Sequence, residues 1–358
     1  MEKNKEIELL TRLVNIKSET YNETEACEHF ARVLPSFGWG SIKIDEVGNV
    51  IAQRGNGSKE IMLLGHIDTV PGGPLARIDG NVLWGRGSVD AKGPLCALTV
   101  AGGIADIPPD WRITLIAAVG EEGDYPGAVH IIPKYSPAGC IIGEPSGTSG
   151  ITIGYRGFLR AKLHARDEGV HRSRSAGPIT ATLHAASDIM RMVEAKDKPD
   201  RPVIERPSGA IMSMLGKEEG ARSALIDLDI RLPIGADIEG YISALKEISN
   251  SNNVQIDILS AMPAYLVDKN NPMARALRIA VRNEGLSPRI YAKGGSADFN
   301  LAADWHCPIA AYGPGDSKLD HTNEEHLDLE SYMTSISILK NGIERFVKSC
   351  EWQVASCE

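Results

Sequence analysis

The chain has 358 residues, 42% of them hydrophobic, and a formal net charge of −9 at pH 7. A chain of this length favours two domains with substantial cores, and its negative charge disfavours a nucleic acid as the main ligand, because phosphate binding requires a basic surface. The six cysteines are scattered without a CxxC pair, which argues against both a disulfide framework and a thiolate zinc site.

The N-terminal region has no feature of a secreted or membrane-bound protein. Its first twenty residues include several charged side chains and lack the apolar core of a signal peptide. The apolar stretches elsewhere fall far short of the roughly 20 residues that a membrane-spanning helix needs. We therefore expect a cytoplasmic protein with neither a membrane nor a nucleic acid as its partner.

The first fifty-five residues predict two helices followed by a hairpin. Apolar residues recur at helical spacing over residues 7–14, and a second helix is predicted over about 23–37, with Gly38 ending it. The segment 41–55 alternates between apolar and polar residues and turns at a Gly-Asn pair, which predicts a hairpin at the edge of a sheet.

Three later apolar runs each end at a residue type that binds metals. IMLLG precedes His66, ITLIAAVG precedes Glu121 and Glu122, and CIIG precedes Glu144. Such runs predict parallel strands that are buried on both faces. Because open α/β sheets carry their chemistry at the carboxyl ends of the strands, we expect these side chains in one crevice. Asp90 lies in the glycine-rich segment GRGSVDAKG between the first two runs.

The pattern changes at about residue 155. Residues 159–165 and 226–232 alternate between apolar and polar side chains, as in a sheet with one solvent-facing side. Helical periodicity covers 179–193 and 238–248. These elements predict an inserted α+β domain over residues 155–264.

The buried pattern then returns. Asn271 as a cap and Pro272 at the first helical position predict the start of a helix, and Gly285 marks its end. PIAAYG predicts a short strand, and apolar residues over 329–343 predict a long final helix.

Together these elements predict an α/β fold with two domains. The first is a catalytic domain with a mostly parallel sheet flanked by helices, formed by residues 1–154 and 265–358. The second is the inserted α+β domain over residues 155–264, which we interpret as a lid.

The segment GHIDTVPGG places His66 and Asp68 two residues apart, so that both side chains point the same way in extended backbone. A carboxylate behind a metal-binding imidazole fixes the tautomer and orientation of the ring, which makes Asp68 a candidate partner of His66. Alone, the pair is weak evidence, since most single histidines are ordinary surface or core residues. Its position at the end of a strand strengthens the metal interpretation.

Asp90 stands among glycines that allow the backbone to bend close to a site, and its two carboxylate oxygens can bridge two cations. A phosphate-binding loop is the alternative interpretation of this segment. It fits poorly, because Lys92 precedes Gly93, and Pro94 stands where a magnesium-binding serine or threonine would be needed.

Glu121 and Glu122 are neighbours, and neighbouring residues in extended backbone point to opposite sides, so one can bind metal while the other faces substrate. A solvated acidic loop is the alternative. Glu144 directly follows CIIG, where a charge is costly unless it is paired. HTNEEH adds His321 and His326, either of which would be ordinary in isolation.

Charge balance favours a joint interpretation of these residues. Two divalent cations would be neutralised by Asp90, Glu122 and Glu144 together with one hydroxide, and imidazoles would complete the ligand shells. Without metal, the crowded carboxylates would repel one another and some would take up protons. We therefore expect metal to stabilise the fold.

These motifs resemble a known family. GHIDTVPGG, GRGSVDAKG, the Glu-Glu pair, GEPS and HTxxE at residues 321–325 are similar to those of the zinc amidohydrolases that include acetylornithine deacetylase, succinyl-diaminopimelate desuccinylase and the glutamate carboxypeptidases. The resemblance spans nearly the whole chain, with the motifs in the family's order.

The resemblance implies a role for each of these side chains. The ligands that it implies for two Zn²⁺ (or Co²⁺) ions are His66, Asp90 and Glu144 for one ion and Asp90, Glu122 and His321 for the other. It implies that Glu121 is the general base and that Asp68 orients His66. It also implies a cis peptide bond between Asp90 and Ala91.

For the inserted domain, the resemblance implies a homodimer formed through the lid. His171 of VHRSRSAG would reach the neighbour's site and polarise the scissile carbonyl. Arg231 of DIRLP, with Gly295 and Ser296 of KGGSADFN, look like substrate contacts. Their alternative interpretation is that they are polar residues on the solvent-facing side of a lid.

A narrower resemblance concerns the substrate. Ala91 and Pro94 in GRGSVDAKGP, with GEPSG followed by GYRG, are similar to the branch that releases lysine or ornithine from an amino-group carrier protein. The amide would join the α-amino group of lysine to the γ-carboxyl group of the carrier's C-terminal glutamate. An acidic carrier would need a local basic patch on this acidic chain, and the candidates are Arg156, Arg160, Arg172 and Arg174.

Other functions stay open at this point. Within the family, the alternatives are acetylornithine deacetylase, succinyl-diaminopimelate desuccinylase or dipeptidase activity. In another class, the chain could be a non-catalytic metal-binding scaffold. Glu121 stands against the scaffold, because a metal site alone does not require it.

Overall fold

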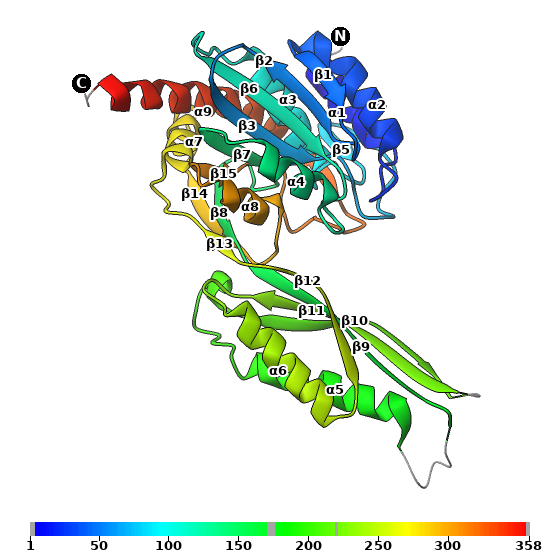
Figure 1. The fold of residues 1–358 in the computed structure, drawn as a ribbon. Helices are drawn as coiled ribbons and strands as arrows, with labels where there is room; N and C mark the ends of the chain where they lie inside the picture. Colours follow the sequence, from blue (N-terminus) through cyan, green and yellow to red (C-terminus); the bar gives the residue numbers. More distant parts are fainter. Residues whose placement is uncertain (1–3, 170–175, 219–220, 356–358) are drawn as a thin grey trace. The chain divides into compact units, whose positions relative to one another are not determined.

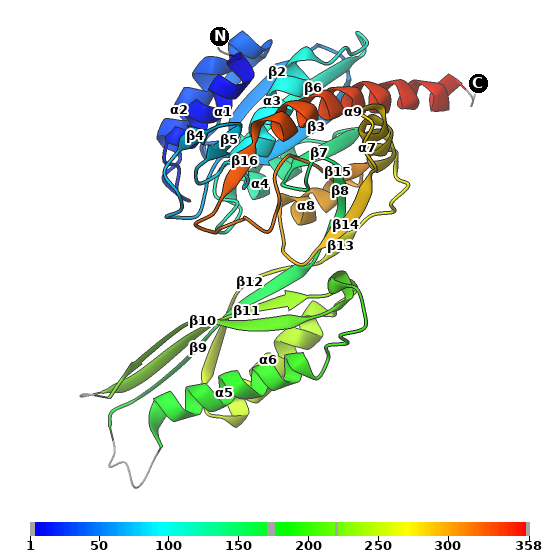
Figure 2. The same ribbon diagram turned by 180° about the vertical axis from the view of Figure 1, so that it is seen from behind.

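The computed structural model describes residues 4–169, 176–218 and 221–355, and Figures 1 and 2 show it from opposite sides. The described chain divides into two compact units, each built from more than one segment. The segments of the larger unit are Met1–Ile153, Val267–Tyr291 and Ala297–Glu358. Those of the smaller unit are Gly154–Leu266 and Ala292–Ser296. The sequence predicts boundaries after residues 154 and 264 and does not single out the short second segment of the smaller unit.

The main sheet has the strand order β1-β2-β6-β3-β7-β15-β8-β13, and β14 also pairs with β8. Its central strands β6, β3, β7 and β15 pair in parallel, whereas the flanking pairs are antiparallel. The predicted α/β fold with a mostly parallel central sheet is thereby confirmed. The strands are β1 (Gly40–Ile44), β2 (Val50–Arg54), β3 (Lys59–His66), β6 (Trp111–Ala118), β7 (Gly139–Gly143), β8 (Gly150–Tyr155), β13 (Tyr265–Leu266), β14 (Arg289–Lys293) and β15 (Ile309–Ala311).

The three apolar runs of the sequence form β3, β6 and β7, and nearly every residue of these strands is buried. Helices cover both faces of the sheet, as an all-parallel centre requires. Helices α3 (Lys92–Ile104) and α9 (Leu329–Ala355) lie on the side seen in Figure 2, and α4 (Pro126–Ile131) and α8 (Asp298–Leu301) lie on the other side. The carboxyl ends of β3, β6 and β7 are therefore the edge at which the polar side chains emerge.

The remaining predicted elements of the larger unit also form. They are α1 (Lys5–Asn15), α2 (Thr24–Val33), the 3₁₀ helix η1 (Leu34–Phe37) and α7 (Pro272–Asn283). The second helix changes to 3₁₀ geometry near Pro35, which lacks a backbone N–H, and ends at Gly38 with φ of 85°. The side chain of Asn271 caps α7 by accepting hydrogen bonds from the backbone of Met273 and Ala274. The edge hairpin of β1 and β2 is antiparallel, as predicted.

A small antiparallel sheet brings together two loops that are far apart in the sequence. Its order is β16-β5-β4, with β4 (Arg77–Asp79), β5 (Val82–Trp84) and β16 (His326–Asp328). The pairing of His326 with Trp84 aligns the end of β5 with the start of β16. Consequently the glycine-rich loop that follows β5 lies next to the HTNEE loop that precedes β16.

The smaller unit is an antiparallel sheet packed against two described helices. Its strand order is β10-β11-β9-β12. The elements are β9 (Gly157–Asp167), α5 (Gly177–Glu194), the 3₁₀ helix η3 (Val203–Glu205), β10 (Ser208–Lys217), β11 (Arg222–Leu232), α6 (Ile238–Ser251) and β12 (Gln255–Met262). Alternate residues of β9 and β11 are buried against the helices, which accounts for the period-2 pattern in the sequence.

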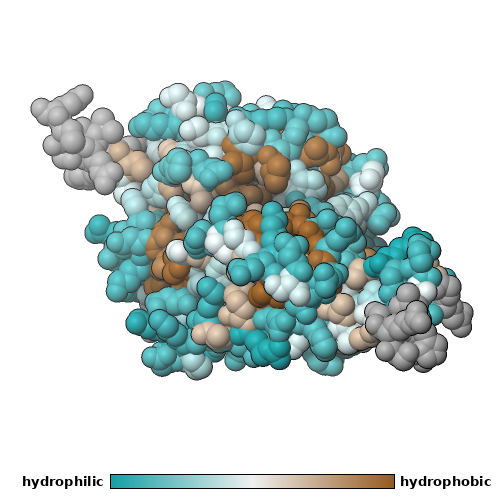
Figure 3. Space-filling view, turned by 60° about the horizontal axis from the view of Figure 1, so that its bottom comes forward, coloured by the Kyte–Doolittle hydropathy of each residue, from teal (hydrophilic) through white to brown (hydrophobic). Residues whose placement is uncertain are grey.

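The face shown in Figure 3 is mainly hydrophilic, with hydrophobic groups between hydrophilic ones. Among the helices that the structure describes, none combines the length and the apolar character that crossing a membrane requires.

Candidate metal centre

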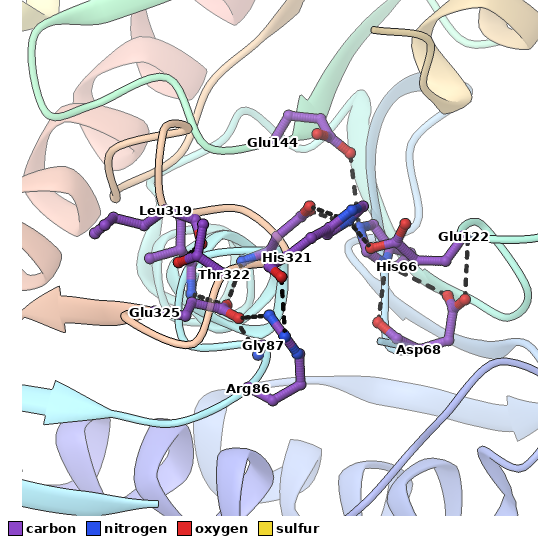
Figure 4. Close-up of polar contacts among 12 residues, drawn as sticks. His66, Asp68, Arg86, Gly87, Glu122, Glu144, Leu319, His321, Thr322 and Glu325 are labelled. Atoms are coloured by element: carbon purple, nitrogen blue, oxygen red, sulfur yellow. Dashed lines mark hydrogen bonds and ion pairs between the residues drawn. The ribbon is translucent and has the colours of Figure 1, made fainter. Parts of the chain in front are cut away.

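Side chains of the predicted ligand types come together at the carboxyl edge of the parallel strands (Figure 4). His66 is the last residue of β3, and Glu144 directly follows β7. Glu122 follows β6 after a short connection. Asp90 lies in the loop between β5 and α3, and His321 lies in the loop before β16. Five separate segments of the chain thus build one cluster.

Asp90 occupies the middle of this cluster. Its Oδ1 lies 3.3 Å from Nε2 of His66, and its Oδ2 lies 3.2 Å from Nε2 of His321. Nε2 of His321 also lies 2.9 Å from Oε1 of Glu122, and Nε2 of His66 lies 3.8 Å from Oε1 of Glu144. The two oxygens of one carboxylate therefore face two different imidazoles, which is the arrangement that a bridging ligand needs. The Asp90–Ala91 peptide bond is cis, as the family resemblance implies.

The donor atoms of this cluster fit divalent cations. Ligand atoms of His66, Asp90 and Glu122 all lie within 4.8 Å of one another. Burial, and next to it the neighbouring Asp90, raises the pKa of Glu122. Burial raises the pKa of Glu121 well above its usual range, and the nearby carboxylates of Glu144 and Asp298 add to this effect. Imidazole nitrogens beside crowded carboxylates, which oppose one another's ionisation, are a suitable site for positive ions.

The pKa values of the imidazoles of His66 and His321 are also shifted. Hydrogen bonds to Asp90 and Glu122 raise the pKa of His321 to about 10. Burial lowers the pKa of His66, but the charge of Glu121 and the contacts with Asp68 and Asp90 outweigh burial and raise it well above its usual range. In the metal-free protein the ring of His321 is therefore protonated at neutral pH.

We expect metal loading to release protons at pH 7. A histidine binds metal as the neutral imidazole, so a proton competes with the ion at any pH below the ring's pKa. For His321 the metal affinity should therefore rise as the pH increases towards about 10. Isothermal titration of the metal-free protein with Zn²⁺ in buffers of different ionisation enthalpy measures the released protons. A binding heat that is the same in all buffers would contradict this expectation.

The Glu-Glu pair lies in a turn rather than in extended backbone. The prediction that these neighbours point to opposite sides of a strand is therefore wrong in its geometry. Strand β6 ends at Ala118, and Gly120 turns the chain with φ of 71°; a Cβ there would lie 2.6 Å from Pro126. The turn directs Glu122 towards His321 and leaves Glu121 buried, with 7% of its surface exposed.

Asp68 has a larger structural part than the sequence indicates. Its Oδ1 lies 3.3 Å from Nδ1 of His66, as expected of a partner that orients the ring. The same carboxylate accepts backbone hydrogen bonds from Glu121 at 3.0 Å and from Glu122 at 3.1 Å. The hydroxyl of Thr20 donates to Oδ2 at 3.0 Å. Asp68 therefore fixes both the first imidazole and the turn that carries the glutamates, a contact across more than fifty residues that no local pattern reports.

Asp298 is a further acidic residue of the site that the sequence analysis did not select. It is 1% exposed, and neither carboxylate oxygen has a hydrogen-bond partner among the described residues. Burial raises its pKa to about 7, and its charge interacts with those of His66 and Asp68. The residue belongs to the same KGGSADFN segment as Gly295 and Ser296, so the motif pointed to the segment but not to this side chain.

The predicted substrate contacts lie in the smaller unit. Nη1 of Arg231 donates to Oγ of Ser296 at 3.2 Å, and that hydroxyl donates to the backbone oxygen of Arg156 at 2.7 Å. A Cβ on Gly295 would meet no described atom within 4 Å. The structure thus joins Arg231 and Ser296 in one network within the smaller unit, and Gly295 precedes Ser296 in the chain.

The predicted docking arginines are only partly described. His171, Arg172 and Arg174 lie outside the described residues. Arg156 donates from Nε to the backbone oxygen of Gly294 at 2.7 Å, and Nε of Arg160 lies 3.5 Å from Asp229. Both described arginines therefore have partners within the smaller unit.

The phosphate-loop alternative is excluded by the position of Lys92. Its side chain is 1% exposed and points to the end of α1, where Nζ donates to the backbone oxygens of Leu13 at 3.2 Å and Ile16 at 2.7 Å. Burial lowers its pKa to about 8. An ammonium group that neutralises the carbonyl end of a helix in this way is not directed at a ligand.

The chain is similar to known proteins over almost its whole length. The model of peptidase family M20/M25/M40 matches residues 62–345. A protein of Pyrococcus horikoshii with the provisional name LysW-lysine/LysW-ornithine hydrolase is 37% identical over 337 residues, which cover 93% of this chain and 95% of that protein. The LysW-lysine hydrolase of Deinococcus radiodurans is 32% identical over 352 residues, covering 95% and 96% of the two chains.

Solved structures show the same fold. The M20 family metallo-carboxypeptidase Sso-CP2 from Sulfolobus solfataricus superposes with a TM-score of 0.80 at 16% sequence identity, covering 97% of this chain and all of that chain. At this identity the likeness concerns the fold alone.

Proposed function

Since the chain belongs to peptidase family M20/M25/M40, and is thus a metal-dependent hydrolase of amide bonds, we propose that it releases lysine, ornithine or both from the carrier protein LysW. The bond cleaved is the amide between the amino acid's α-amino group and the γ-carboxyl group of the carrier's C-terminal glutamate. The relatives' names and their coverage of the chain support this substrate. Acetylornithine deacetylase, succinyl-diaminopimelate desuccinylase and dipeptidase activities are not favoured.

One observation carries the catalytic part of the proposal. Glu121 is a buried carboxyl group in the turn next to the ligand candidate Glu122, and its pKa is sensitive to His66 and Glu144. A metal-binding scaffold needs the neighbouring ligands but not this group. Its raised pKa in the metal-free site shows that the surroundings disfavour an isolated charge, which bound cations would stabilise.

The proposed ion ligands are His66, Asp90 and Glu144 for one Zn²⁺ and Asp90, Glu122 and His321 for the other. When bound, the ions would supply Lewis acidity, which lowers the pKa of water and polarises the amide carbonyl. Cobalt is an alternative ion, because imidazole and carboxylate donors also suit Co²⁺. Asp68 holds His66 and the glutamate turn in their mutual positions.

Proton transfer is the part that Glu121 performs. Its carboxylate accepts a proton from the water that attacks the carbonyl carbon. As the C–N bond breaks, Glu121 returns this proton to the leaving nitrogen, which becomes the α-amino group of the free amino acid. The carrier keeps the new carboxylate. His171, which lies outside the described residues, is proposed to reach the site from the partner subunit and to polarise the carbonyl.

A substrate panel tests the proposed activity. The zinc-loaded enzyme is offered carrier-linked lysine, carrier-linked ornithine, N-acetylornithine and succinyl-diaminopimelate, and free amine is measured. We expect release from one or both carrier conjugates at least tenfold faster than from the two small acyl compounds. The Glu121→Gln variant serves as the blank. Release only from N-acetylornithine or succinyl-diaminopimelate would refute the carrier as substrate.

We also propose that the smaller unit forms the dimer, through the edge strand β10. All ten residues of this strand are exposed, and its partner β11 occupies only one of its edges. Its exposed apolar side chains include Met212 at 67% and Leu215 at 67%. An uncovered edge with apolar side chains favours pairing with a second chain.

Introducing a lysine into this strand should weaken the dimer. A lysine on an edge strand opposes edge-to-edge pairing, so Leu215→Lys is expected to raise the dimer's dissociation constant roughly tenfold or more. Size-exclusion chromatography with light scattering measures the mass over a concentration series. Leu75→Lys, at a more exposed leucine in the larger unit, is the matched control and should leave the dimer intact. Equal masses for Leu215→Lys and the wild type would place the interface elsewhere.

A further inference from the structure

Glu325 is a buried charge to which neither the ligand set nor the proton transfer gives a role. It stands in the loop between His321 and β16, and it is 0% exposed. In the sequence it is the glutamate of HTxxE. A fully buried carboxylate is costly unless hydrogen bonds or an opposite charge compensate for the lost hydration.

The compensating partners of Glu325 come from the loop that carries Asp90 (Figure 4). Its Oε1 accepts backbone hydrogen bonds from Gly87 at 2.9 Å, Val89 at 3.0 Å and Asp90 at 3.1 Å. One carboxylate oxygen therefore binds three N–H groups of a single loop. The separation along the chain is more than 230 residues, so these contacts fix a tertiary arrangement rather than a local turn.

Arg86 extends the same connection to the second imidazole. Its Nη1 pairs with Oε2 of Glu325 at 2.5 Å, and its Nη2 donates to the backbone oxygen of His321 at 3.3 Å. In the opposite direction, the backbone N–H of Gly85 donates to the backbone oxygen of Glu325 at 3.3 Å. The two loops are thus cross-linked at side-chain and backbone level.

The geometry at Asp90 makes this cross-link relevant to metal binding. The backbone N–H of Asp90 donates to Glu325. The carboxylate oxygens of Asp90 lie 3.3 Å from Nε2 of His66 and 3.2 Å from Nε2 of His321. A shift of the backbone at this residue would move both oxygens relative to both rings. Changing a partner that orients a ligand in this way typically costs about 10–100-fold in metal affinity.

We propose that Glu325 is a positioning residue that holds Asp90 between His66 and His321 and thereby sets the affinity of the centre for its metal ions. The inference rests on the proposed metal centre but not on the identity of the substrate. Arg86 supports this position, because it neutralises Glu325 and donates a hydrogen bond to the backbone oxygen of His321. The role is distinct from that of Asp68, which orients His66 and the glutamate turn from the other side of the cluster.

The test is the binding of Zn²⁺ alone to the full-length, metal-free protein, measured by competition with a chelating dye. Glu325→Gln keeps the size of the side chain but removes its charge, and its N–H₂ group replaces one of the two acceptor oxygens that the three N–H groups and Arg86 require. We expect the dissociation constant to rise about 10–100-fold, the range found for partners that orient metal ligands. At saturating Zn²⁺, kcat and KM for the preferred conjugate should return to within a few-fold of the wild type.

Rescue by metal separates positioning from general stability. If Glu325 served only to stabilise the fold, the variant would unfold at a lower temperature but would bind Zn²⁺ with unchanged affinity while folded. That result would overturn the proposal, as would an affinity within twofold of the wild type. Glu324→Gln, an adjacent and exposed position, is the matched control and should leave both quantities unchanged.

A second variant covers the case in which Glu325→Gln does not fold. Arg86→Lys retains a positive charge beside Glu325 but cannot span both Glu325 and the backbone oxygen of His321. We expect it to weaken Zn²⁺ binding as well, by roughly tenfold, and wild-type affinity in this variant would overturn the proposal. Because the Zn²⁺-binding measurements use no substrate, a failure of the carrier panel would refute the proposed function while leaving the positioning role intact.

Discussion

Replacing Glu121 by glutamine is expected to abolish nearly all turnover while the metal centre stays loaded. Glutamine has the same size and preserves the backbone hydrogen bond from this residue to Asp68. It cannot accept a proton from water or return one to the leaving amine. General acid–base catalysis contributes about 10²–10⁴-fold to the rate, and kcat should fall by a factor in this range.

The measurement for Glu121→Gln combines steady-state kinetics on the preferred conjugate with metal analysis of the purified protein. The expected pattern is a large loss in kcat with a metal content equal to that of the wild type. Asp124→Asn is the matched control, because this exposed carboxylate belongs to the same turn and should have little effect. A kcat close to the wild-type value would assign the base to another residue.

Replacing Asp90 by asparagine is expected to have the largest effect on the metal centre itself. The neutral amide offers one oxygen instead of two, so it cannot face both His66 and His321 with an anionic oxygen. The loss in affinity should exceed the roughly 100-fold that a change in an orienting partner causes. Turnover should be lost together with metal, in contrast to the Glu121 variant.

Thermal and denaturant unfolding at a fixed Zn²⁺ concentration measures how much metal affinity the Asp90→Asn variant has lost. At about 1,000 times the wild-type Kd, bound metal stabilises the wild type by about 4.1 kcal/mol, and a 100-fold weaker variant gains about 2.7 kcal/mol less. Asp110→Asn changes an exposed carboxylate that pairs with Lys59 and should respond to Zn²⁺ as the wild type does. Equal stabilisation of the Asp90 variant would show that this carboxylate does not bridge the ions.

The strands and most ligand candidates could be found from the sequence because their signals are local. Buried parallel strands are continuous apolar runs, so the position after each run is marked, and His66 and Glu144 follow directly. Asp90 was marked by its glycines. The loop containing His321 became significant only through the resemblance to the family, since its placement depends on the pairing of β16 with β5.

The orientation of the glutamates and the supporting contacts could not be predicted from local patterns. The turn after Gly120 replaces the extended backbone that the sequence analysis assumed. The bonds from Glu325 to the Asp90 loop and from Asp68 to the glutamate turn join residues that are distant in the chain. Such contacts depend on the completed tertiary structure, which periodicity and spacing do not report.

Strand β15 is synthesised long after the strands it pairs with, which leaves the sheet incomplete during translation. This strand inserts between β7 and β8, although both of these neighbours are synthesised much earlier. At roughly 5–20 residues per second, the ribosome needs on the order of 10–30 seconds to pass from β7 to β15. During this interval the backbone edge of β7 that later pairs with β15 has no permanent neighbour and is open to association with other nascent chains. A chain that stops before residue 309 can complete neither the sheet nor the metal centre, because His321 is made last.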